Sequence, residues 1–291
     1  MARANPTYSP SVRRRRLGRH LRSLRDKAGY TMADVSQRLG WAKAKVGKLE
    51  TSELKTVKPS DLDSLLTLYG VEDDEQREAL HQLARDAKQR GWWWKYRDVF
   101  GAESLPDFET EASLIRTYEV AIVPGLLQTP EYAEGVFLGG RYTSPDKIKR
   151  QVDARMERRE ILTRYERPPR LVAVIDEAAL RRPMGDRDVM RGQFEYLLRI
   201  GQLPNIDIQV LPFAVGPHAA LGMSFTLLDF PDPLDAPIAY TDSVASGVFE
   251  ETDAEVESYT TTFGELQGAA LSTVQSARFI EDILSEESDE S

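Results

Sequence analysis

The stretch TMADVSQRLGWAKAKVGKLE, residues 31 to 50, constrains the fold of this chain more than any other. It contains two short runs with apolar residues at helical spacing, and Gly40 separates them. Glycine readily adopts the left-handed backbone that a tight turn between helices needs. Thr31, with Asp34 three residues later, has the pattern of a capping box at the start of the first run. The stretch therefore predicts two short helices joined by a tight turn.

Three further helices are predicted beside this pair. Apolar residues recur at spacings of four and three over residues 17–24, which indicates one face of a preceding helix, and Gly29 marks its end. A fourth helix is predicted to start with Ser60 as its cap, and a fifth to span residues 72–89. We therefore expect an all-α domain of five helices over residues 1–90.

Charge is divided unevenly along the chain, which has a net charge of −9. Residues 1–58 hold 15 Lys and Arg against 4 Asp and Glu, whereas the remaining 233 residues hold 23 against 43. A basic segment ahead of an acidic one indicates that the basic segment binds a polyanion. A basic helix that is merely solvated would give the same pattern.

The first domain resembles the helix-turn-helix of phage-repressor-like regulators of the xenobiotic-response-element type. The motifs that carry the resemblance are L-x-x-L-R-x-x-A-G-x-T, V-S-x-x-L-G-W and K-V-x-K-L-E-T. The resemblance implies that Arg25 and Glu50 form a nearly buried ion pair between the first and third helices. The chain departs from the family at Ala42, Gly47 and Ser52, where a Ser or Thr cap, a serine and a glycine are usual.

The resemblance implies that the third helix contacts DNA. Lys43 and Lys48 are placed to reach base edges, and Ala44 to meet a thymine methyl group. Phosphate contacts are expected of Thr31, Met32 and Lys45. The full predicted DNA-binding set is Thr31, Met32, Lys43, Ala44, Lys45, Gly47, Lys48 and Thr51. Two alternatives stay open: the lysines are merely solvated, or the helix-turn-helix mediates only protein contacts.

Three consecutive tryptophans, Trp92, Trp93 and Trp94, lie just before Tyr96. No single helix face can bury three consecutive side chains, so at least one of them must face another surface. We predict a hinge over residues 91–106, packed on the domains that flank it. The alternative is a contact with a second copy of the chain or with a partner, because Trp and Tyr are common interface anchors.

Residues 107–284 are predicted to form a mixed α/β domain, which makes the fold class of the chain α+β. This domain is expected to begin with a helix through Tyr118 and to contain a small sheet of about five strands with flanking helices. Strands at 171–176 and 206–213 with a helix between them indicate a parallel crossover. The acidic residues 285–291 are predicted to be a disordered tail.

This second domain is similar to the C-terminal domain of WhiJ-like actinobacterial regulators. The similarity rests on I-R-T-Y-E-x-x-x-V-P-G-L-L-Q-T-x-x-Y-A, V-I-D-E-A-A-L-R-R and P-x-I-x-I-Q-V-L-P-F. Together with the helix-turn-helix, it covers residues 13 to 284. It implies an antitoxin-like regulator whose C-terminal domain binds a very small partner protein encoded beside it.

Few residues in this chain suit catalysis or metal binding. The chain has no cysteine, and its three histidines, His20, His81 and His218, are far apart. Asp176 and Glu177 are adjacent acids at a predicted strand end, and we interpret them as helix-start residues because adjacent strand residues point to opposite faces. His218 is predicted to be structural or solvent-facing. We expect no catalytic residue, no metal and no cofactor.

The sequence therefore predicts a sequence-specific, DNA-binding transcription regulator that binds double-stranded operator DNA, such as its own promoter, as a homodimer. The apolar, glycine-containing connection at 210–225 could line a pocket, so a small-molecule sensor is the alternative to a partner-binding domain, and an enzyme is a further one. No apolar run is long enough to span a membrane, and the absence of cysteine is compatible with the cytoplasm, where we expect the protein.

Overall fold

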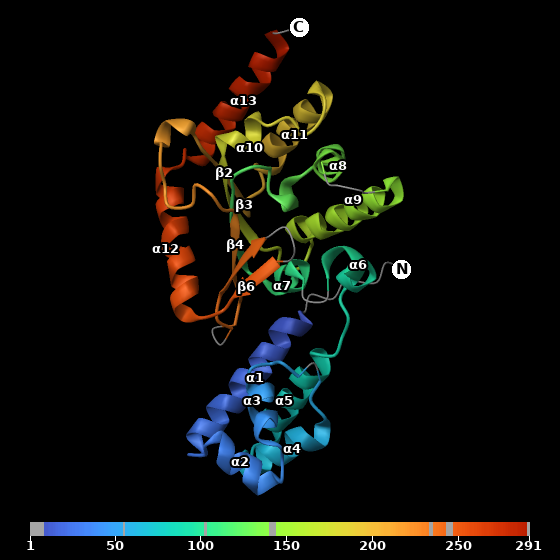
Figure 1. The fold of residues 1–291 in the computed structure, drawn as a ribbon, viewed down its shortest axis with the longest axis vertical. Helices are drawn as coiled ribbons and strands as arrows, with labels where there is room; N and C mark the ends of the chain where they lie inside the picture. Colours follow the sequence, from blue (N-terminus) through green and yellow to red (C-terminus); the bar gives the residue numbers. More distant parts are fainter. Residues whose placement is uncertain are drawn as a thin grey trace. The chain divides into compact units, whose positions relative to one another are not determined.

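The computed structural model describes residues 9–54, 56–101, 104–139, 144–232, 235–242 and 247–289 (Figure 1). The chain forms two compact units that divide between Lys95 and Tyr96, inside the segment that the tryptophans mark. The first unit, here called the head, is Met1–Lys95 together with the short segment Asp232–Asp235. The second, here called the body, is Tyr96–Pro231 with Ala236–Ser291.

The described part of the head contains five α-helices, as the sequence predicts. They are α1 (Pro10–Lys27), α2 (Met32–Leu39), α3 (Lys43–Glu50), α4 (Pro59–Leu68) and α5 (Asp74–Asp86). The predicted capping box is present: the Asp34 amide donates to Thr31 Oγ1, and the Thr31 amide donates to Asp34 Oδ2. Gly40 takes φ +65° in the turn between α2 and α3. Capping and turn residues that are close together in the sequence were therefore sufficient to predict the helices of this domain.

The start of α4 differs from the predicted one, and no start was predicted for α1. Helix α1 begins at Pro10, where the hydroxyl of Ser9 accepts a hydrogen bond from the Val12 amide. Helix α4 begins at Pro59, with Lys58 as its N-cap and no side-chain cap bond, so Ser60 does not cap it. A proline suits the first helical position because its missing N–H would have no partner there, and this lets the helix start two residues earlier.

Gly18 lets α1 approach the end of α3 closely. A β-carbon at Gly18 would lie 2.5 Å from the carbonyl oxygen of Glu50, a distance that backbone atoms do not tolerate. On α3, a β-carbon at Gly47 would meet only Met32 Sδ at 3.7 Å, which is ordinary contact.

We therefore expect the same substitution to have opposite effects at these two glycines. Gly18→Ala should destabilise the head by about 1–3 kcal/mol through overpacking. Gly47→Ala should stabilise it by up to ~1 kcal/mol because alanine favours helix. Chemical unfolding followed by circular dichroism measures both changes. A stabilised Gly18→Ala variant would mean that the two helices are not so closely packed.

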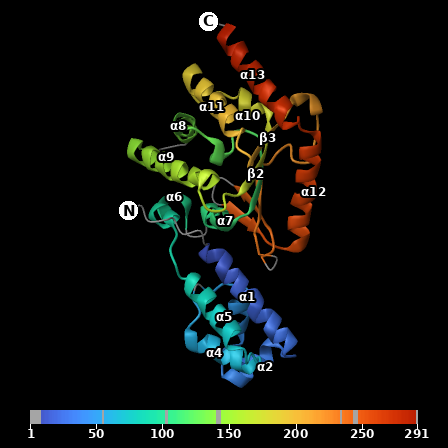
Figure 2. The same ribbon diagram turned by 180° about the vertical axis from the view of Figure 1, so that it is seen from behind.

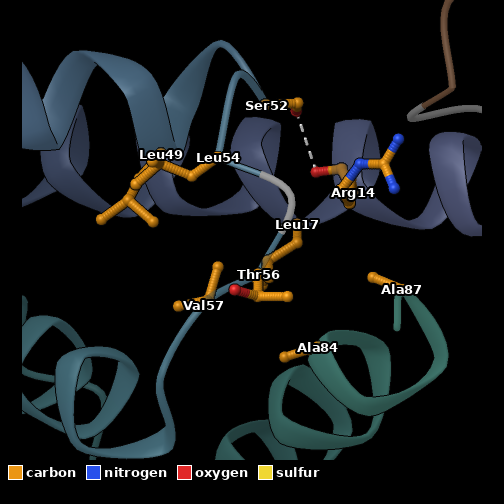
Figure 3. Close-up of a pocket in the computed structure, with 9 residues that line it drawn as sticks. All are labelled: Arg14, Leu17, Leu49, Ser52, Leu54, Thr56, Val57, Ala84 and Ala87. Carbon is orange, nitrogen blue, oxygen red and sulfur yellow. Dashed lines mark hydrogen bonds between the residues drawn. The ribbon is translucent and has the colours of Figure 1, made fainter. Parts of the chain in front are cut away.

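Ser52, where the related regulators usually have glycine, has the left-handed backbone that explains the preference, with φ +64°. Its hydroxyl donates to the Arg14 carbonyl oxygen at 3.0 Å, which ties the end of α3 to α1 (Figure 3). The gap that these two residues line with Leu17 and Ala84 has a volume of about 10 Å³. A space of that size holds at most one water molecule, so it is a packing gap and not a ligand site.

A mixed sheet organises the body and gives the chain its predicted α+β class. Its strands are β1 (Leu114–Glu119), β2 (Arg170–Asp176), β3 (Ile206–Leu211), β4 (Phe225–Asp229), β5 (Ile238–Asp242) and β6 (Gly247–Glu250). The order is β3-β2-β1-β4-β5-β6. Strands β1, β2 and β3 are parallel, as the predicted crossover requires, whereas β4, β5 and β6 continue from β1 in antiparallel pairs.

Strand β1 corrects the prediction of a helix through Tyr118 and supplies a sixth strand. It lies inside the sheet, pairing with β2 on one side and with β4 on the other. Ile115 and Thr117 are β-branched and Tyr118 is aromatic, and all three are buried. Such side chains fit a pleated sheet, so pairing with distant strands decides the structure of this segment.

Helices cover both faces of the sheet, and the two faces differ in polarity. They are α6 (Arg97–Phe100), α7 (Leu105–Glu111), α8 (Pro130–Leu138), α9 (Pro145–Arg159), α10 (Glu177–Arg181), α11 (Arg187–Ile200), α12 (Asp253–Ala269) and α13 (Thr273–Asp289). In Figures 1 and 2, α12 lies on one side of the sheet and α8 and α9 on the other. The α12 side is an apolar core that includes Tyr118, Phe225 and Phe263. The α9 side carries polar residues such as Thr117 and Glu119.

The predicted disordered tail is also corrected, because α13 continues to Asp289. Ile280 and Ile283 are buried, and Glu286 pairs with Arg181 at 3.1 Å. Extending an existing helix is inexpensive compared with starting one, so the acidic residues continue it. Residues 290 and 291 lie outside the described part. Within that part, no helix is both long and apolar enough to cross a membrane.

Candidate functional site

Helix α3 is fixed to the head by its inner face. Val46 and Leu49 are buried there, at 1% and 4% exposure, in the core that all five helices share. Ala42 is the N-cap and makes no side-chain cap bond. Packing therefore holds this short helix in place without the cap that related helices have.

The outer face of α3 carries most of the predicted DNA contacts. Lys43, Ala44 and Lys48 are exposed, as are Thr31 and Met32 at the start of α2. The Met32 side chain lies beside the backbone of Gly47, so the start of α2 adjoins this face. The structure therefore places these predicted residues on adjoining surfaces of two helices.

Lys45 and Thr51 are engaged within the head. The Lys45 ammonium lies 2.9 Å from Asp61 Oδ1 and 3.7 Å from the centre of the Trp41 ring. The Thr51 hydroxyl donates to the carbonyl oxygen of Gly47 at 3.0 Å. A phosphate would have to compete with these contacts. The basic groups that α3 presents are thus Lys43 and Lys48.

Arg25 and Glu50 are paired as the resemblance implies. Arg25 Nε and Nη2 donate to the two carboxylate oxygens of Glu50 at 2.7 and 2.9 Å. The two side chains are only 9% and 6% exposed. Arg25 Nη1 also donates to the carbonyl oxygen of Tyr30 and to Asp26. Hydrogen bonding to Glu50 holds the pKa of Arg25 above its ordinary value. The pair sets how α1 and α3 cross.

The tryptophans lie in a short 3₁₀ helix, Trp92–Tyr96. Trp93 is buried, and its ring lies where a β-carbon at Gly91 would be. Trp92 packs edge-on against Trp93, with ring centroids 6.1 Å apart, and Arg90 lies over Trp94. Trp92 and Trp94 are half-buried. The three rings are thus buried to different extents, as consecutive side chains must be.

Asp176 and Glu177 both make structural bonds. Asp176 is the N-cap of α10 and accepts a hydrogen bond from the Ala178 amide at 2.8 Å. Glu177 accepts from Arg181 at 2.7 Å and from the Phe213 amide at 2.9 Å. Among the described residues, no group of three or more His, Asp or Glu could hold a metal ion.

His218 is not solvent-facing. Its side chain is 10% exposed, and it lies edge-on to Tyr118, with Nε2 3.4 Å from the tyrosine hydroxyl. The same nitrogen is 3.8 Å from Asp176 Oδ2. The contacts of His218 with Tyr118 and Asp176 could not be inferred from the sequence, because Tyr118 lies on β1, the strand that we predicted to be a helix.

The body contains a cleft of about 1030 Å³ between α9 and the polar face of the sheet. From the predicted pocket-lining connection, only Gly222–Phe225 lies on its wall. Sequence reasoning missed its charged residues, which include Glu119, Arg155 and Arg158. One signal was available: Gln151, Arg155 and Arg158 are spaced by four and three, so they share one face of α9.

Glu119 lies in this cleft beside Ser224, Arg155, Arg158 and Asp242, and burial raises its pKa to about 7. The folded body therefore binds a proton more tightly than the unfolded chain does, so its stability should fall as pH rises from about 4.5 to 7.

We expect Glu119→Gln to remove this decline. The free energy of unfolding of the variant should exceed that of the parent by more at pH 8 than at pH 4.5, and the increase should be on the order of 1–3 kcal/mol. This range allows for the partial exposure of Glu119. Urea unfolding at the two pH values measures the difference, and Glu134→Gln, on the exposed side of α8, is the control. Parallel pH profiles for the parent and Glu119→Gln would show that Glu119 titrates normally.

Comparison with known protein families agrees with the division into head and body. Residues 16–80 match a family described as a helix-turn-helix domain. Residues 102–282 match a family described as a domain of unknown function, DUF5753. No curated protein and no solved structure matches the chain. Since the second match covers more than half of the chain, this protein belongs to the DUF5753 family and carries a helix-turn-helix domain ahead of the family domain.

Proposed function

We propose that this protein is a transcription regulator that reads a specific DNA site with α3. The supporting observation is a helix held by Val46, Leu49 and the Glu50 ion pair, with Lys43 and Lys48 exposed on its outer face. In the major groove, the lysines would donate to guanine and Ala44 would meet a thymine methyl group. The amino end of α2 would lie at a phosphate.

The protein acts as a homodimer in this proposal. Phage-repressor-like heads bind two half-sites about one helical turn, ~34 Å, apart, so a palindromic operator is expected. Each head alone presents few polar groups to bases, and two heads together double the contacts. The half-buried Trp92 and Trp94 and the adjacent Tyr96 are candidates for the contact between copies or with a partner.

The body acts by binding rather than by catalysis in this proposal, as in WhiJ-like, antitoxin-like regulators. Asp176 and Glu177, the acids that suggested chemistry, are already engaged in helix capping and ion pairing. Residues 96–291 hold 35 acidic against 18 basic residues, so a small basic protein is the complementary partner. Titration with the small protein encoded beside the gene tests this. If the small protein neither binds this chain nor changes its affinity for DNA, it is not the partner.

DNA binding is tested with the duplex upstream of the protein's own gene against a scrambled duplex, at two salt concentrations. Tight binding that resists the scrambled competitor is expected. The affinity should fall with salt by a slope of about 0.9 per phosphate contact. Equal and weak binding to both duplexes would contradict specific recognition of this site. A head that binds no duplex would favour the alternative that the helix-turn-helix contacts only proteins.

A further inference from the structure

The body cleft is too large and too polar to be a packing defect. Protein interiors are close-packed and leave few voids larger than a water molecule. The volume of about 1030 Å³ is at the upper end of the range for small-molecule sites, ~300–1000 Å³. All of its lining residues belong to the body. The cleft is therefore a candidate ligand site that is independent of the head.

The two arginines on the α9 side of the cleft are held differently. Arg158 donates two hydrogen bonds of 2.7 Å to Glu109, so its charge is balanced by a carboxylate. Arg155 donates to the neutral amide oxygen of Gln128 at 2.6 Å and lies over the Phe137 ring. No carboxylate among the described residues forms an ion pair with Arg155. Glu119, Asp242 and Glu109 act on Arg155 only through space, so Arg155 brings into the cleft a positive charge that no carboxylate of the described residues contacts directly.

The fixed orientation of Gln128 keeps Arg155 in place. The Gln128 amide nitrogen donates to the Val123 carbonyl oxygen at 2.7 Å, which leaves its oxygen for Arg155. Burial and the neighbouring Arg158 lower the pKa of Arg155 to about 10, against the opposing effect of nearby carboxylates that include Glu119, so the guanidinium remains charged at neutral pH. An anionic group in the cleft would relieve this desolvated charge.

The sheet supplies further polar groups across the cleft. Thr117 on β1 and Thr226 on β4 are opposite each other, with hydroxyl oxygens 3.1 Å apart, and Tyr240 on β5 follows them. On α9, the buried Oε1 of Gln151 has no hydrogen-bond partner among the described residues. Buried polar atoms usually have partners, so this acceptor is suited to a donor on a ligand.

Apolar side chains form much of the remaining lining, and they include Phe100, Leu105, Ile115, Ile122, Leu126 and Phe137. Ligand sites typically combine such a lining with a few placed polar groups. An inorganic anion would leave these apolar walls unused, whereas a larger organic anion would cover them. The size of the cleft, its apolar lining and the lack, among the described residues, of a directly bonded carboxylate at Arg155 thus indicate one class of ligand.

We infer that the cleft binds a small amphipathic organic anion, whose carboxylate or phosphate is held by Arg155 and whose apolar part lies against the aromatic walls. This site goes beyond the proposed DNA recognition, and it requires neither DNA nor a dimer.

Two fluorescent probes test the site on the full-length protein: 1-anilinonaphthalene-8-sulfonate, which is an anion, and N-phenyl-1-naphthylamine, its uncharged counterpart. Both should bind the parent chain with saturation. Arg155→Gln should weaken binding of the anionic probe at least about tenfold, because a charge-assisted hydrogen bond is lost, and should leave the neutral probe nearly unaffected. Lys149→Gln, an exposed charge change on the same helix, is the matched control.

A second variant blocks the cleft without removing a charge. A β-carbon at Gly222, on the cleft wall, meets nothing within 4 Å, so Gly222→Phe should fold normally and weaken both probes. Displacement by 4-phenylbutyrate or by phenyl phosphate then distinguishes carboxylate from phosphate ligands, and 4-phenylbutanol should displace less than either. Failure of the parent to bind the anionic probe, or binding that survives both substitutions, overturns the inference. DNA affinity is measured separately, so its loss would not affect this result.

Discussion

Glu50→Ala is expected to unfold most of the head at physiological temperature. The substitution leaves the Arg25 guanidinium charged and buried without its bidentate partner. Breaking a buried ion pair by removing one partner costs about 3–5 kcal/mol. Small domains have total stabilities near the lower end of ~5–15 kcal/mol, so this loss approaches the whole. Chemical unfolding of the parent and the variant, followed by helical circular dichroism, gives the difference.

Two comparisons separate this effect from a general loss of surface charge. Glu53→Ala removes an exposed acid three residues along the chain and should cost less than ~1 kcal/mol. Replacing both partners together, Arg25→Met with Glu50→Leu, should restore much of the stability, because no buried charge remains unpaired. A Glu50→Ala variant as stable as Glu53→Ala would mean that the pair contributes nothing to the head.

The head could be predicted because its determinants are close together in sequence. The capping box spans three residues, and Gly40 gives the turn between α2 and α3. Even the ion pair between Arg25 and Glu50 spans only 25 positions, and the motif around each residue is recognisable. Local propensity and tertiary structure agree here, and that agreement makes a fold readable from sequence.

The body could be predicted only in part, because its sheet joins segments that are far apart. Strand β1 pairs with β2 more than 50 residues later and with β4 more than 100 residues later. Nothing near Leu114 indicates those partners, and the flanking acidic residues also occur readily in helices. Strands β2 and β3 could be predicted from local signals, because β2 is a nearly continuous apolar run that is buried on both faces and β3 begins with alternating apolar and polar residues.

The cleft was beyond sequence reasoning for a related reason. Glu119, Arg155 and Tyr240 come from three elements, and each resembles an ordinary surface residue within its own segment. Arg155 and Arg158 differ in their bonding partners, because Glu109, on another helix, forms hydrogen bonds with Arg158. The sequence shows that the arginines share a face of α9, but only the structure shows which of them lacks a directly bonded carboxylate in the described part of the chain.

Lys43→Ala with Lys48→Ala is expected to abolish specific DNA binding while leaving the head folded. Both lysines are exposed and hold no helix in place, so the melting temperature should change little. A side chain that reads a base contributes about 1–3 kcal/mol, so the double change should lower affinity for the specific site by roughly 30-fold to more than 1000-fold. Competition binding to the specific duplex and a scrambled duplex, at two salt concentrations, measures this.

The control variant is Lys88→Ala, which removes an exposed lysine beyond the end of α5 and should leave the affinity for the specific duplex within about twofold of the parent.

The salt dependence of binding then assigns the role of Lys43 and of Lys48. If the lysines read bases, the single variants lose specificity while the salt slope is nearly unchanged. If they contact phosphates, affinity for both duplexes falls equally, and the slope decreases by about 0.9 for each lysine. Unchanged affinity in the double variant would remove α3 from the interface, because Lys45 and Thr51 are engaged within the head and Ala44 offers no hydrogen bond.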